Sequence, residues 1–203
     1  MRVLPASVTT LSEALTVLRT GGVVAHATET CYGLACDLSN LTAVSKLFAI
    51  KHRPPAQPVS ALFASRPQAQ QYVEWNERAE ELADKHLPGP LTIILPIRKD
   101  APKQLFPITH PSQHIATLGL RISSHPLAQS LVEAFGSPLS TTSANVHGEP
   151  NPYDAHSIAK RFIEEEWQPD LVIDSGHLPQ VPPSTVIDLT EQGRVLRAGS
   201  LPK

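Results

Sequence analysis

The sequence predicts a mixed α/β domain built on one substantial twisted sheet. Segments with apolar residues at helical spacing alternate along the chain with short apolar runs typical of buried strands, and Gly and Pro residues separate them. The chain has 203 residues, of which 41% are hydrophobic. It is therefore long enough to bury a core, and we expect residues 1–203 to form a single domain.

Helices are expected where apolar residues recur at helical spacing between recognisable start and stop signals. The first is expected to start at a capping box from Thr10 to Glu13 and to stop at Gly21. The second is capped by Asn40 and ends before Pro54. The remaining helices are predicted at Asn76 to His86, Pro126 to Phe135 and Ala155 to Glu166.

Strands are expected at the short apolar runs that turn residues bound. They are Val23 to Ala27, Val59 to Phe63, Leu91 to Leu95, Leu118 to Ile122, Pro138 to Thr142, Leu171 to Ile173, Thr185 to Asp188 and Arg194 to Leu196. Polar residues follow several of these runs directly. Loops at strand ends are where α/β sheets place their ligands, so these polar residues are candidates for a site.

Composition excludes several classes of protein. The formal net charge of −2 argues against a protein whose main task is to grip a long nucleic acid. No apolar run reaches the roughly 18 residues of a membrane helix, and the N-terminus lacks the apolar stretch of a secretory signal, so a cytoplasmic protein without membrane contact is expected. Cys31 and Cys36 have a spacing that suits neither zinc nor a disulfide and are expected to be buried thiols.

The common catalytic motifs are missing. Neither G-x4-G-K-[ST] nor G-x-G-x-x-G occurs, so any phosphate contacts must come from another arrangement. Neither G-x-S-x-G nor H-E-x-x-H occurs, and the nine histidines are scattered singly. Both a hydrolase triad and a resident metal centre are therefore disfavoured.

Residues suited to chemistry gather instead in an ordered series of clusters. The series runs through Gly21 to Leu34, Lys51-x-Arg53-Pro54, Pro88-Gly89-Pro90-x-Thr92, Arg121 with His125-Pro126, Thr141 to Asn145 with Gly148, Pro183 to Val186, and Arg197-x-Gly199. Each cluster alone also has an ordinary explanation, such as a capping Thr or a turn Asn. As a series, spanning almost the whole chain, they resemble the threonylcarbamoyl-AMP synthase family, also called YrdC or TsaC, in its short single-domain form. The most specific feature is Lys51-x-Arg53 paired with Ser143-x-Asn145.

The resemblance implies a fold and a reaction. The fold is a twisted, largely parallel sheet with flanking helices around a concave basic cavity. The reaction joins L-threonine, bicarbonate or CO2, and ATP into threonylcarbamoyl-AMP with loss of pyrophosphate, and Mg2+ bridges the phosphates. The partner that consumes the product is a threonylcarbamoyl transferase complex, which modifies the adenosine beside the anticodon of tRNA. Weak binding of tRNA by this chain is compatible with that role.

The resemblance also carries roles to individual residues. The catalytic set is Lys51, Arg53, Ser143 and Asn145; the ATP contacts are Arg53, Gln57, Thr117, Ser143, Asn151 and Arg197; the threonine contacts are Thr30, Arg121, Thr141 and Ser184. Lys51 offers a compact cation and Arg53 a planar fork, both suited to the triphosphate. No side chain is an obvious nucleophile, which favours catalysis by positioning and electrostatics.

Two departures and two alternatives remain open. Ala27 stands where the family usually has proline, and Leu62 stands where some members have a histidine that contacts threonine. The second departure leaves open a lower affinity for threonine or another amino acid. One alternative function is an RNA-binding module without synthase activity. The other is a different carbamoyl or acyl adenylate synthase on the same fold, acting on another amino acid or on carbamoyl phosphate.

Overall fold

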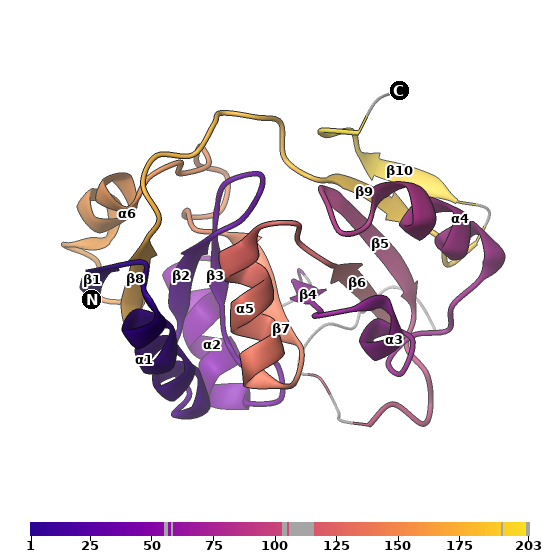
Figure 1. The fold of residues 1–203 in the computed structure, drawn as a ribbon, viewed down its shortest axis with the longest axis horizontal. Coiled ribbons are helices and arrows are strands. Elements are labelled where there is room, and N and C mark those ends of the chain that lie inside the picture. The colour runs from indigo at the N-terminus through magenta and orange to yellow at the C-terminus, as the bar shows by residue number, and fades with distance from the viewer. Residues whose placement is uncertain (55–56, 58, 103–104, 106–115, 192, 202–203) are drawn as a thin grey trace.

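A computed structural model describes residues 1–54, 57, 59–102, 105, 116–191 and 193–201. Within these residues ten strands form one sheet in the order β1-β8-β2-β3-β7-β4-β6-β5-β9-β10 (Figure 1). The strands are β1 (Arg2–Pro5), β2 (Val24–Ala27), β3 (Tyr32–Ala35), β4 (Ser60–Leu62), β5 (Leu91–Pro96), β6 (Thr117–Arg121), β7 (Leu139–Ser143), β8 (Leu171–Asp174), β9 (Thr185–Asp188) and β10 (Arg194–Arg197). The helices are α1 (Val8–Arg19), α2 (Leu41–Ile50), α3 (Arg66–Ala69), α4 (Glu77–His86), α5 (Pro126–Phe135) and α6 (Ala155–Phe162).

The sheet is mixed, as predicted, but parallel pairs do not dominate it. Parallel pairs join β1 to β8, β2 to β8, β4 to β6 and β5 to β9. Antiparallel pairs join β2 to β3, β3 to β7, β4 to β7, β5 to β6 and β9 to β10. The expectation of a largely parallel sheet was therefore wrong. One antiparallel pair has a local cause. Strands β2 and β3 are joined by the short loop of residues 28–31, and so short a connection can only link antiparallel neighbours.

Two apolar clusters cover the two faces of the first half of the sheet. Val24 belongs to the cluster that contains Leu18 of α1 and residues of α5, whereas its neighbour Ala25 belongs to the cluster that contains Leu47 of α2. Figure 1 shows α1 and α5 in front of the sheet and α2 behind it. Because successive strand residues face opposite sides, a strand covered on both faces is buried along its whole length. The burial of every residue of β2 agrees with this arrangement.

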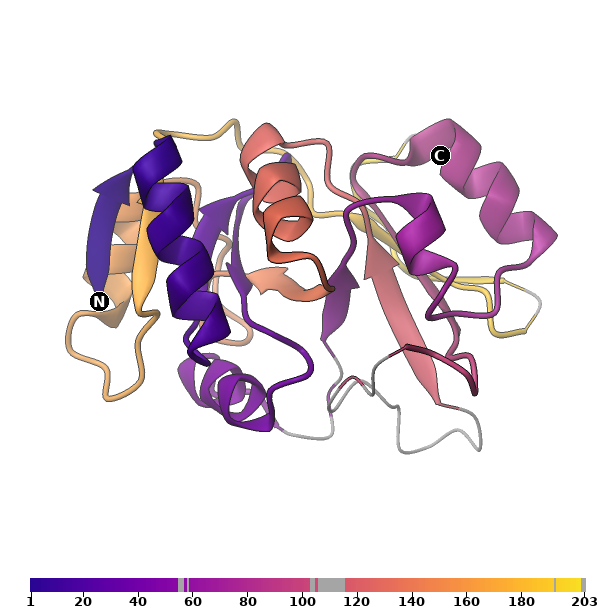
Figure 2. The ribbon, with the colours of Figure 1, turned by 60° about the horizontal axis from the view of Figure 1, so that its bottom comes forward.

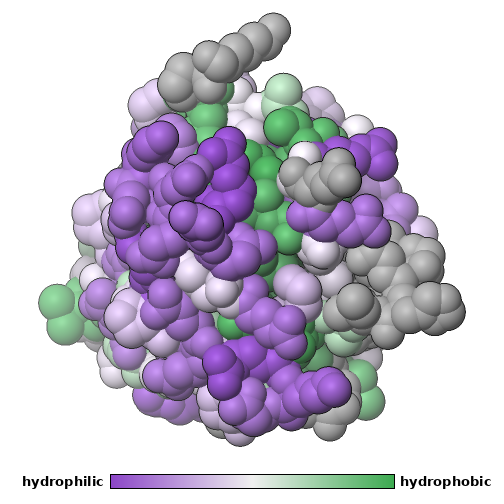
Figure 3. Space-filling view, turned by 90° about the vertical axis from the view of Figure 1, so that its right-hand side faces the viewer, coloured by the Kyte–Doolittle hydropathy of each residue, from purple (hydrophilic) through white to green (hydrophobic). Residues whose placement is uncertain are grey.

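The second half of the sheet is covered by α3 and α4, which lie beside β5 and β6 (Figure 2). The sheet ends at β10, all four residues of which are exposed, with Val195 and Leu196 among the exposed apolar side chains. The side of the molecule that carries α4 and β10 is mostly hydrophilic, with a narrow hydrophobic strip (Figure 3). Arg194 at the start of β10 places charge on this edge, which discourages pairing with other strands.

Most predicted elements are confirmed, and the differences have local causes. The capping box was wrong: α1 begins earlier, and the cap is Ser7, whose hydroxyl accepts from the amide of Thr10. Glu13 instead forms an ion pair with Arg2. The last helix, α6, ends at Phe162 rather than Glu166, because three successive glutamates follow and negative charge is unfavourable at a helix C-terminus. The sequence patterns did not predict β1, β3 or α3.

Two further findings concern the cysteines and the helices. Cys31 and Cys36 are free and buried, as expected. Across the residues that the structure describes, no helix is both long enough and apolar enough to cross a membrane.

Candidate active site

The end of α2 positions the Lys-x-Arg segment. His52, directly after the helix cap Lys51, has a φ of 48°, in the left-handed region. The amide of Arg53 donates to the carbonyl of Phe48 and the amide of His52 donates to the carbonyl of Ala49. These two bonds form a Schellman motif, here with histidine at the left-handed position that glycine usually occupies. The motif ends the helix and turns the chain between Lys51 and Arg53.

The ammonium group of Lys51 is buried beneath the segment of residues 143–145, the Ser-x-Asn turn. Its Nζ donates to the carbonyl oxygens of Ser143 at 2.6 Å and Asn145 at 2.8 Å, and to Oδ1 of Asn145 at 3.1 Å. An ammonium group has three protons, so these bonds account for all of them. Burial, reinforced by the neighbouring Arg53, lowers the pKa of Lys51 to about 7.

The side chains of the Ser-x-Asn turn complete this cluster. The hydroxyl of Ser143 donates to Oδ1 of Asn145 at 2.6 Å, and Nδ2 of Asn145 donates to the carbonyl of Glu149. The structure thus brings Lys51, Ser143 and Asn145 together in one hydrogen-bonded unit. Arg53 lies beside this unit and donates through Nε to the carbonyl of Gln57 at 3.2 Å.

Strand β6 presents a polar face to a cleft that Lys51 and Arg53 also line. Thr117, Gly119 and Arg121 alternate along the strand and line the cleft, whereas Leu118 and Leu120 between them belong to the core. This is the two-residue period of a strand. At Gly119 a Cβ atom would lie 2.7 Å from Oγ of Ser60, so a side chain there would displace that hydroxyl.

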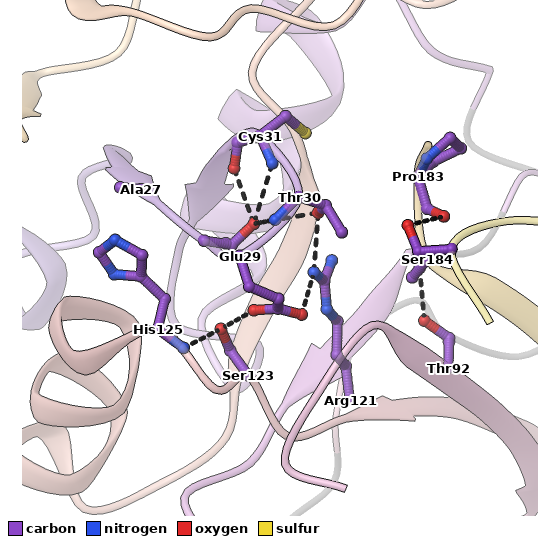
Figure 4. Close-up of polar contacts among 12 residues, drawn as sticks. Ala27, Glu29, Thr30, Cys31, Thr92, Arg121, Ser123, His125, Pro183 and Ser184 are labelled. Carbon is purple, nitrogen blue, oxygen red and sulfur yellow. Dashed lines mark hydrogen bonds and ion pairs between the residues drawn. The ribbon is translucent and has the colours of Figure 1, made fainter. Parts of the chain in front are cut away.

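Arg121 is held by the loop of residues 28–31, which joins β2 to β3. Its Nη2 donates to Oε1 of Glu29 at 2.7 Å and to the hydroxyl of Thr30 at 2.8 Å (Figure 4). Burial alone would raise the pKa of Glu29, but the Arg121 charge and the hydrogen bonds from Ser123 and Arg121 hold it below its ordinary value. The sequence patterns gave no sign of this ion pair.

The opposite wall of the cleft is built around Ser184. Arg197 on β10 donates through Nε to the carbonyl of Ser184 and through Nη2 to its hydroxyl, both at 2.9 Å. The hydroxyls of Ser184 and Thr92 lie 3.0 Å apart. Gly199 packs against this segment, where a Cβ atom would lie 2.1 Å from the carbonyl oxygen of Pro183. The hydrogen bonds between Arg197 and Ser184 therefore hold together the two segments that carry these residues.

The cleft has a volume of about 390 Å³ and a cationic lining. Lys51, Arg53, Arg121 and Arg197 line it, and no Asp or Glu is among the described residues that do so. Burial lowers the pKa values of Arg53 and Arg197 without removing their charge at neutral pH. A site with these properties suits a small ligand that carries several negative charges.

Nearly all the residues that the sequence singled out line this one cleft. They are Thr30, Lys51, Arg53, Thr117, Arg121, Thr141, Ser143, Asn145, Asn151, Ser184 and Arg197. Gln57 does not line it, and contacts the site through its backbone carbonyl. Further lining residues that were not chosen include Cys31, Thr92 and His147. Of these, Cys31 and Thr92 stood in the series of motifs, which was the available signal.

The two departures from the family pattern have a structural setting. Leu62 is fully buried in the apolar cluster of α1 and α5, and it is absent from the described lining of the cleft. Ala27 is the last residue of β2 and is also fully buried. Neither side chain offers a polar group to a ligand.

Acid should destabilise the fold through His26. This side chain on β2 is fully buried, its Nε2 has no hydrogen-bond partner among the described residues, and burial lowers its pKa to about 4. In the unfolded chain this histidine has a pKa near 6.5. Between pH 6.5 and 4 the unfolded state therefore binds one proton more than the folded state does. We expect the free energy of unfolding to fall across that window by on the order of 3 kcal/mol from this residue.

Urea unfolding at pH 7 and pH 4.5 measures this loss. The His26→Leu variant should lose less stability between the two pH values than the unchanged protein does. A variant in which the exposed His156 is replaced is the control. It should lose as much unfolding free energy between pH 7 and pH 4.5 as the unchanged protein does. Equal losses for His26→Leu and the unchanged protein would contradict the assignment.

Comparison with known proteins identifies the relatives of this chain. Residues 16–199 match the model of the family of Sua5, YciO and YrdC, described as "Telomere recombination". The threonylcarbamoyl-AMP synthase of Pyrococcus abyssi is 36% identical over 187 residues, which is 91% of this chain and 52% of that protein. The threonylcarbamoyl-AMP synthase of Vibrio cholerae is 38% identical over 148 residues, which is 71% of this chain and 76% of that protein.

A solved structure has the same fold. The crystal structure of Pyrococcus abyssi Sua5 complexed with L-threonine superposes with a TM-score of 0.85 at 35% sequence identity. The match covers 98% of this chain and 57% of the Sua5 chain. The chain therefore spans little more than half the length of the Pyrococcus protein.

Proposed function

The chain belongs to the Sua5, YciO and YrdC family, and on that premise we propose that it is a threonylcarbamoyl-AMP synthase. It joins L-threonine, bicarbonate or CO2, and ATP into threonylcarbamoyl-AMP and pyrophosphate. The observation that carries the proposal is that Lys51, Arg53, Arg121 and Arg197 meet hydroxyl and amide groups in one cleft, whose described lining residues include no carboxylate. A transferase of this kind must hold an amino acid carboxylate and a triphosphate close together.

Threonine occupies the end of the cleft beside Arg121. Glu29 and Thr30 engage Nη2 of Arg121, so the other guanidinium nitrogens are left to donate to a carboxylate. Thr30, Thr141 and Ser184 offer hydroxyls nearby. The complex of the Pyrococcus relative with L-threonine supports an amino acid substrate for this fold. With its amine carboxylated, threonine presents a carbamate oxygen as the nucleophile.

ATP occupies the part of the cleft lined by Arg53, Thr117, Ser143, Asn151 and Arg197. The carbamate oxygen forms a bond to the α-phosphorus as the bond from that phosphorus to the bridging oxygen breaks, and pyrophosphate leaves with the electron pair. Cationic side chains stabilise the charge that develops on the leaving group. Gln57 joins this set through the backbone beside Arg53.

Mg2+ belongs to this proposal as a companion of the phosphates. Among the described residues no group of three or more His, Cys, Asp or Glu side chains could hold a metal. Mg2+ commonly takes only one or two protein ligands and completes its shell with phosphate oxygens and water. The cleft offers hydroxyl and amide oxygens, which fit a metal that arrives with ATP and supplies charge neutralisation there.

Release of pyrophosphate tests the proposal. The purified protein is incubated with ATP, bicarbonate and threonine, and then with serine or carbamoyl phosphate in place of threonine. Threonine-dependent release supports the proposal, release with another substrate favours a related synthase, and no release with any of them favours an RNA-binding module.

A second arm of the assay adds tRNA, with and without the transferase complex. The proposal includes that complex as the partner and the cytoplasm as the location. Pyrophosphate should appear without the partner, and the modified nucleoside should appear only with it. The net charge of −2 leaves little for a dedicated tRNA-binding surface.

Replacement of Arg121 by lysine should affect threonine more than ATP. Lysine keeps the positive charge, but its single ammonium nitrogen cannot bind Glu29 and Thr30 on one side and the substrate carboxylate on the other, as the planar guanidinium group can. We expect the KM for threonine to rise roughly tenfold, while the KM for ATP stays within about twofold. Equal rises in both constants would show that Arg121 serves the nucleotide or the fold instead.

A further inference from the structure

Glu29 is a buried carboxylate beside the cleft that the proposed reaction does not use. Its side chain is 15% exposed, and it is absent from the residues described as lining the cleft. Both of its oxygens are engaged, Oε1 by Arg121 and Oε2 by the hydroxyl of Ser123. Burying a charged pair costs desolvation energy, so its presence beside a substrate-binding residue calls for a role.

The Glu29 carboxylate joins parts of the chain that are distant in the sheet. Glu29 lies in the loop between β2 and β3, whereas Arg121 lies on β6, and strands β7 and β4 separate β3 from β6. Thr30 of the same loop accepts the second hydrogen bond from Nη2 of Arg121. The loop of residues 28–31 therefore accepts both protons of Nη2 of Arg121, although β7 and β4 lie between the strands that carry the two partners.

A second contact fixes the carboxylate itself. Ser123 donates its hydroxyl proton to Glu29 and accepts a hydrogen bond from the amide of His125, the residue that caps α5. Figure 4 shows the resulting chain, in which Glu29 lies between Ser123 and the Arg121 guanidinium. Ser123, close to the start of α5, thus fixes the carboxylate of Glu29, and that carboxylate in turn fixes the guanidinium group of Arg121.

We propose that Glu29 is a positioning residue, which sets the orientation of the Arg121 guanidinium so that it receives the carboxylate of the substrate. The inference rests on the proposed function, because it assigns Arg121 to the amino acid. A carboxylate that sets geometry must reach Arg121 and accept its hydrogen bond, and its charge is secondary. Small losses of alignment in a site of this kind cost substantial affinity and rate.

This distinction between reach and charge defines the variants. Glu29→Gln keeps the length of the side chain, an oxygen for Arg121 and an amide group for Ser123, but loses the charge. Glu29→Asp keeps the charge but is one methylene shorter. We expect the KM for threonine to rise at least tenfold in Glu29→Asp and Glu29→Ala, and by less than about threefold in Glu29→Gln. The KM for ATP should stay within twofold in all three.

Matched controls separate positioning from general stability. Glu80 also binds donors with both oxygens, Arg66 on one and Trp75 on the other, but lies on α4 away from the cleft. Glu80→Gln and Glu80→Ala should leave both KM values unchanged. Ser123→Ala removes the support of Glu29 without touching Arg121 and should raise the KM for threonine in the same direction as Glu29→Ala, by a smaller factor.

The outcomes separate this inference from the proposed function. If the unchanged protein releases no pyrophosphate with threonine, the proposed function fails before any variant is compared. If it does so and folded Glu29→Ala has an unchanged KM for threonine, the positioning role is wrong. A lower KM in Glu29→Gln would show instead that Glu29 competes with the substrate for Arg121, and equal rises for threonine and ATP would show a structural role.

Discussion

Replacement of Lys51 by methionine should lower synthase turnover by roughly 10²-fold or more. Methionine fills the same volume without an ammonium group, so the oxygens of Ser143 and Asn145 lose the donor that Lys51 supplies. Each buried acceptor without a partner is costly, and the Ser-x-Asn turn should rearrange to find other donors. The side chains that the turn presents to the cleft would then be misplaced.

Affinity for nucleotides shows how Lys51 acts. If its ammonium group orders the turn, the variant should lose affinity for AMP and for ATP by similar factors, within about threefold of each other. If the ammonium group instead contacts the β- and γ-phosphates, the loss should be confined to ATP. The hydrogen bonds that occupy all three of its protons lead us to expect the first result.

Lys46→Met is the matched control. Lys46 lies on the same helix, but it pairs with Asp170 at 2.6 Å and is absent from the described lining of the cleft. Its replacement should leave turnover unchanged. Turnover of Lys51→Met within about twofold of the unchanged protein, with normal thermal unfolding, would contradict any role of Lys51 in the site.

Some of the strands that the sequence predicted have apolar residues on both faces. The runs at Val23 to Ala27 and Leu171 to Ile173 are recognisable because helices or other apolar groups cover both sides of the strands they form. Strand β3 was missed although it is buried along its whole length. It follows a polar loop and contains Gly33, which is poor in local strand propensity but allows the close approach of the carbonyl of Thr142.

The first strand was missed because its stability is not local. The short segment Arg2–Pro5 is mostly exposed and gains its place by pairing with β8, which lies near the other end of the chain. Its sequence contains no signal of that partner. The same holds for the strand order, since β7 lies between β3 and β4 although it follows both in the chain.

The sequence predicted which residues line the cleft better than it predicted the contacts among them. Family resemblance selected residues that line one cleft, but spacing could not show that Lys51 turns beneath the Ser-x-Asn turn while Arg53 lies beside it. That arrangement depends on the left-handed backbone of His52, a residue type that gives little warning of it. The Glu29 to Arg121 pair joins residues 92 positions apart and depends on how the sheet brings its loops together.

The two cationic residues of the Lys-x-Arg segment therefore have different surroundings. Both residues line the cleft, but the ammonium group of Lys51 donates to three protein oxygens, whereas the side chain of Arg53 is partly exposed. A residue that organises a turn acts on every ligand of that turn. A residue that meets the leaving group acts on the chemical step, so the two should differ in which kinetic constant they change.

Replacement of Arg53 by alanine should lower kcat for pyrophosphate release by roughly 10²-fold or more, because a preorganised charge that meets a developing anion contributes on that scale. The KM for ATP should rise by a smaller factor, since the charge on pyrophosphate increases as it leaves. Arg53→Lys restores the charge without the planar fork and should recover only part of the loss. Arg98→Ala, which removes an exposed arginine paired with Asp100, should change neither constant. A rise in KM for ATP with kcat unchanged would show that Arg53 binds ground state and transition state equally, and so does not assist the departure of pyrophosphate.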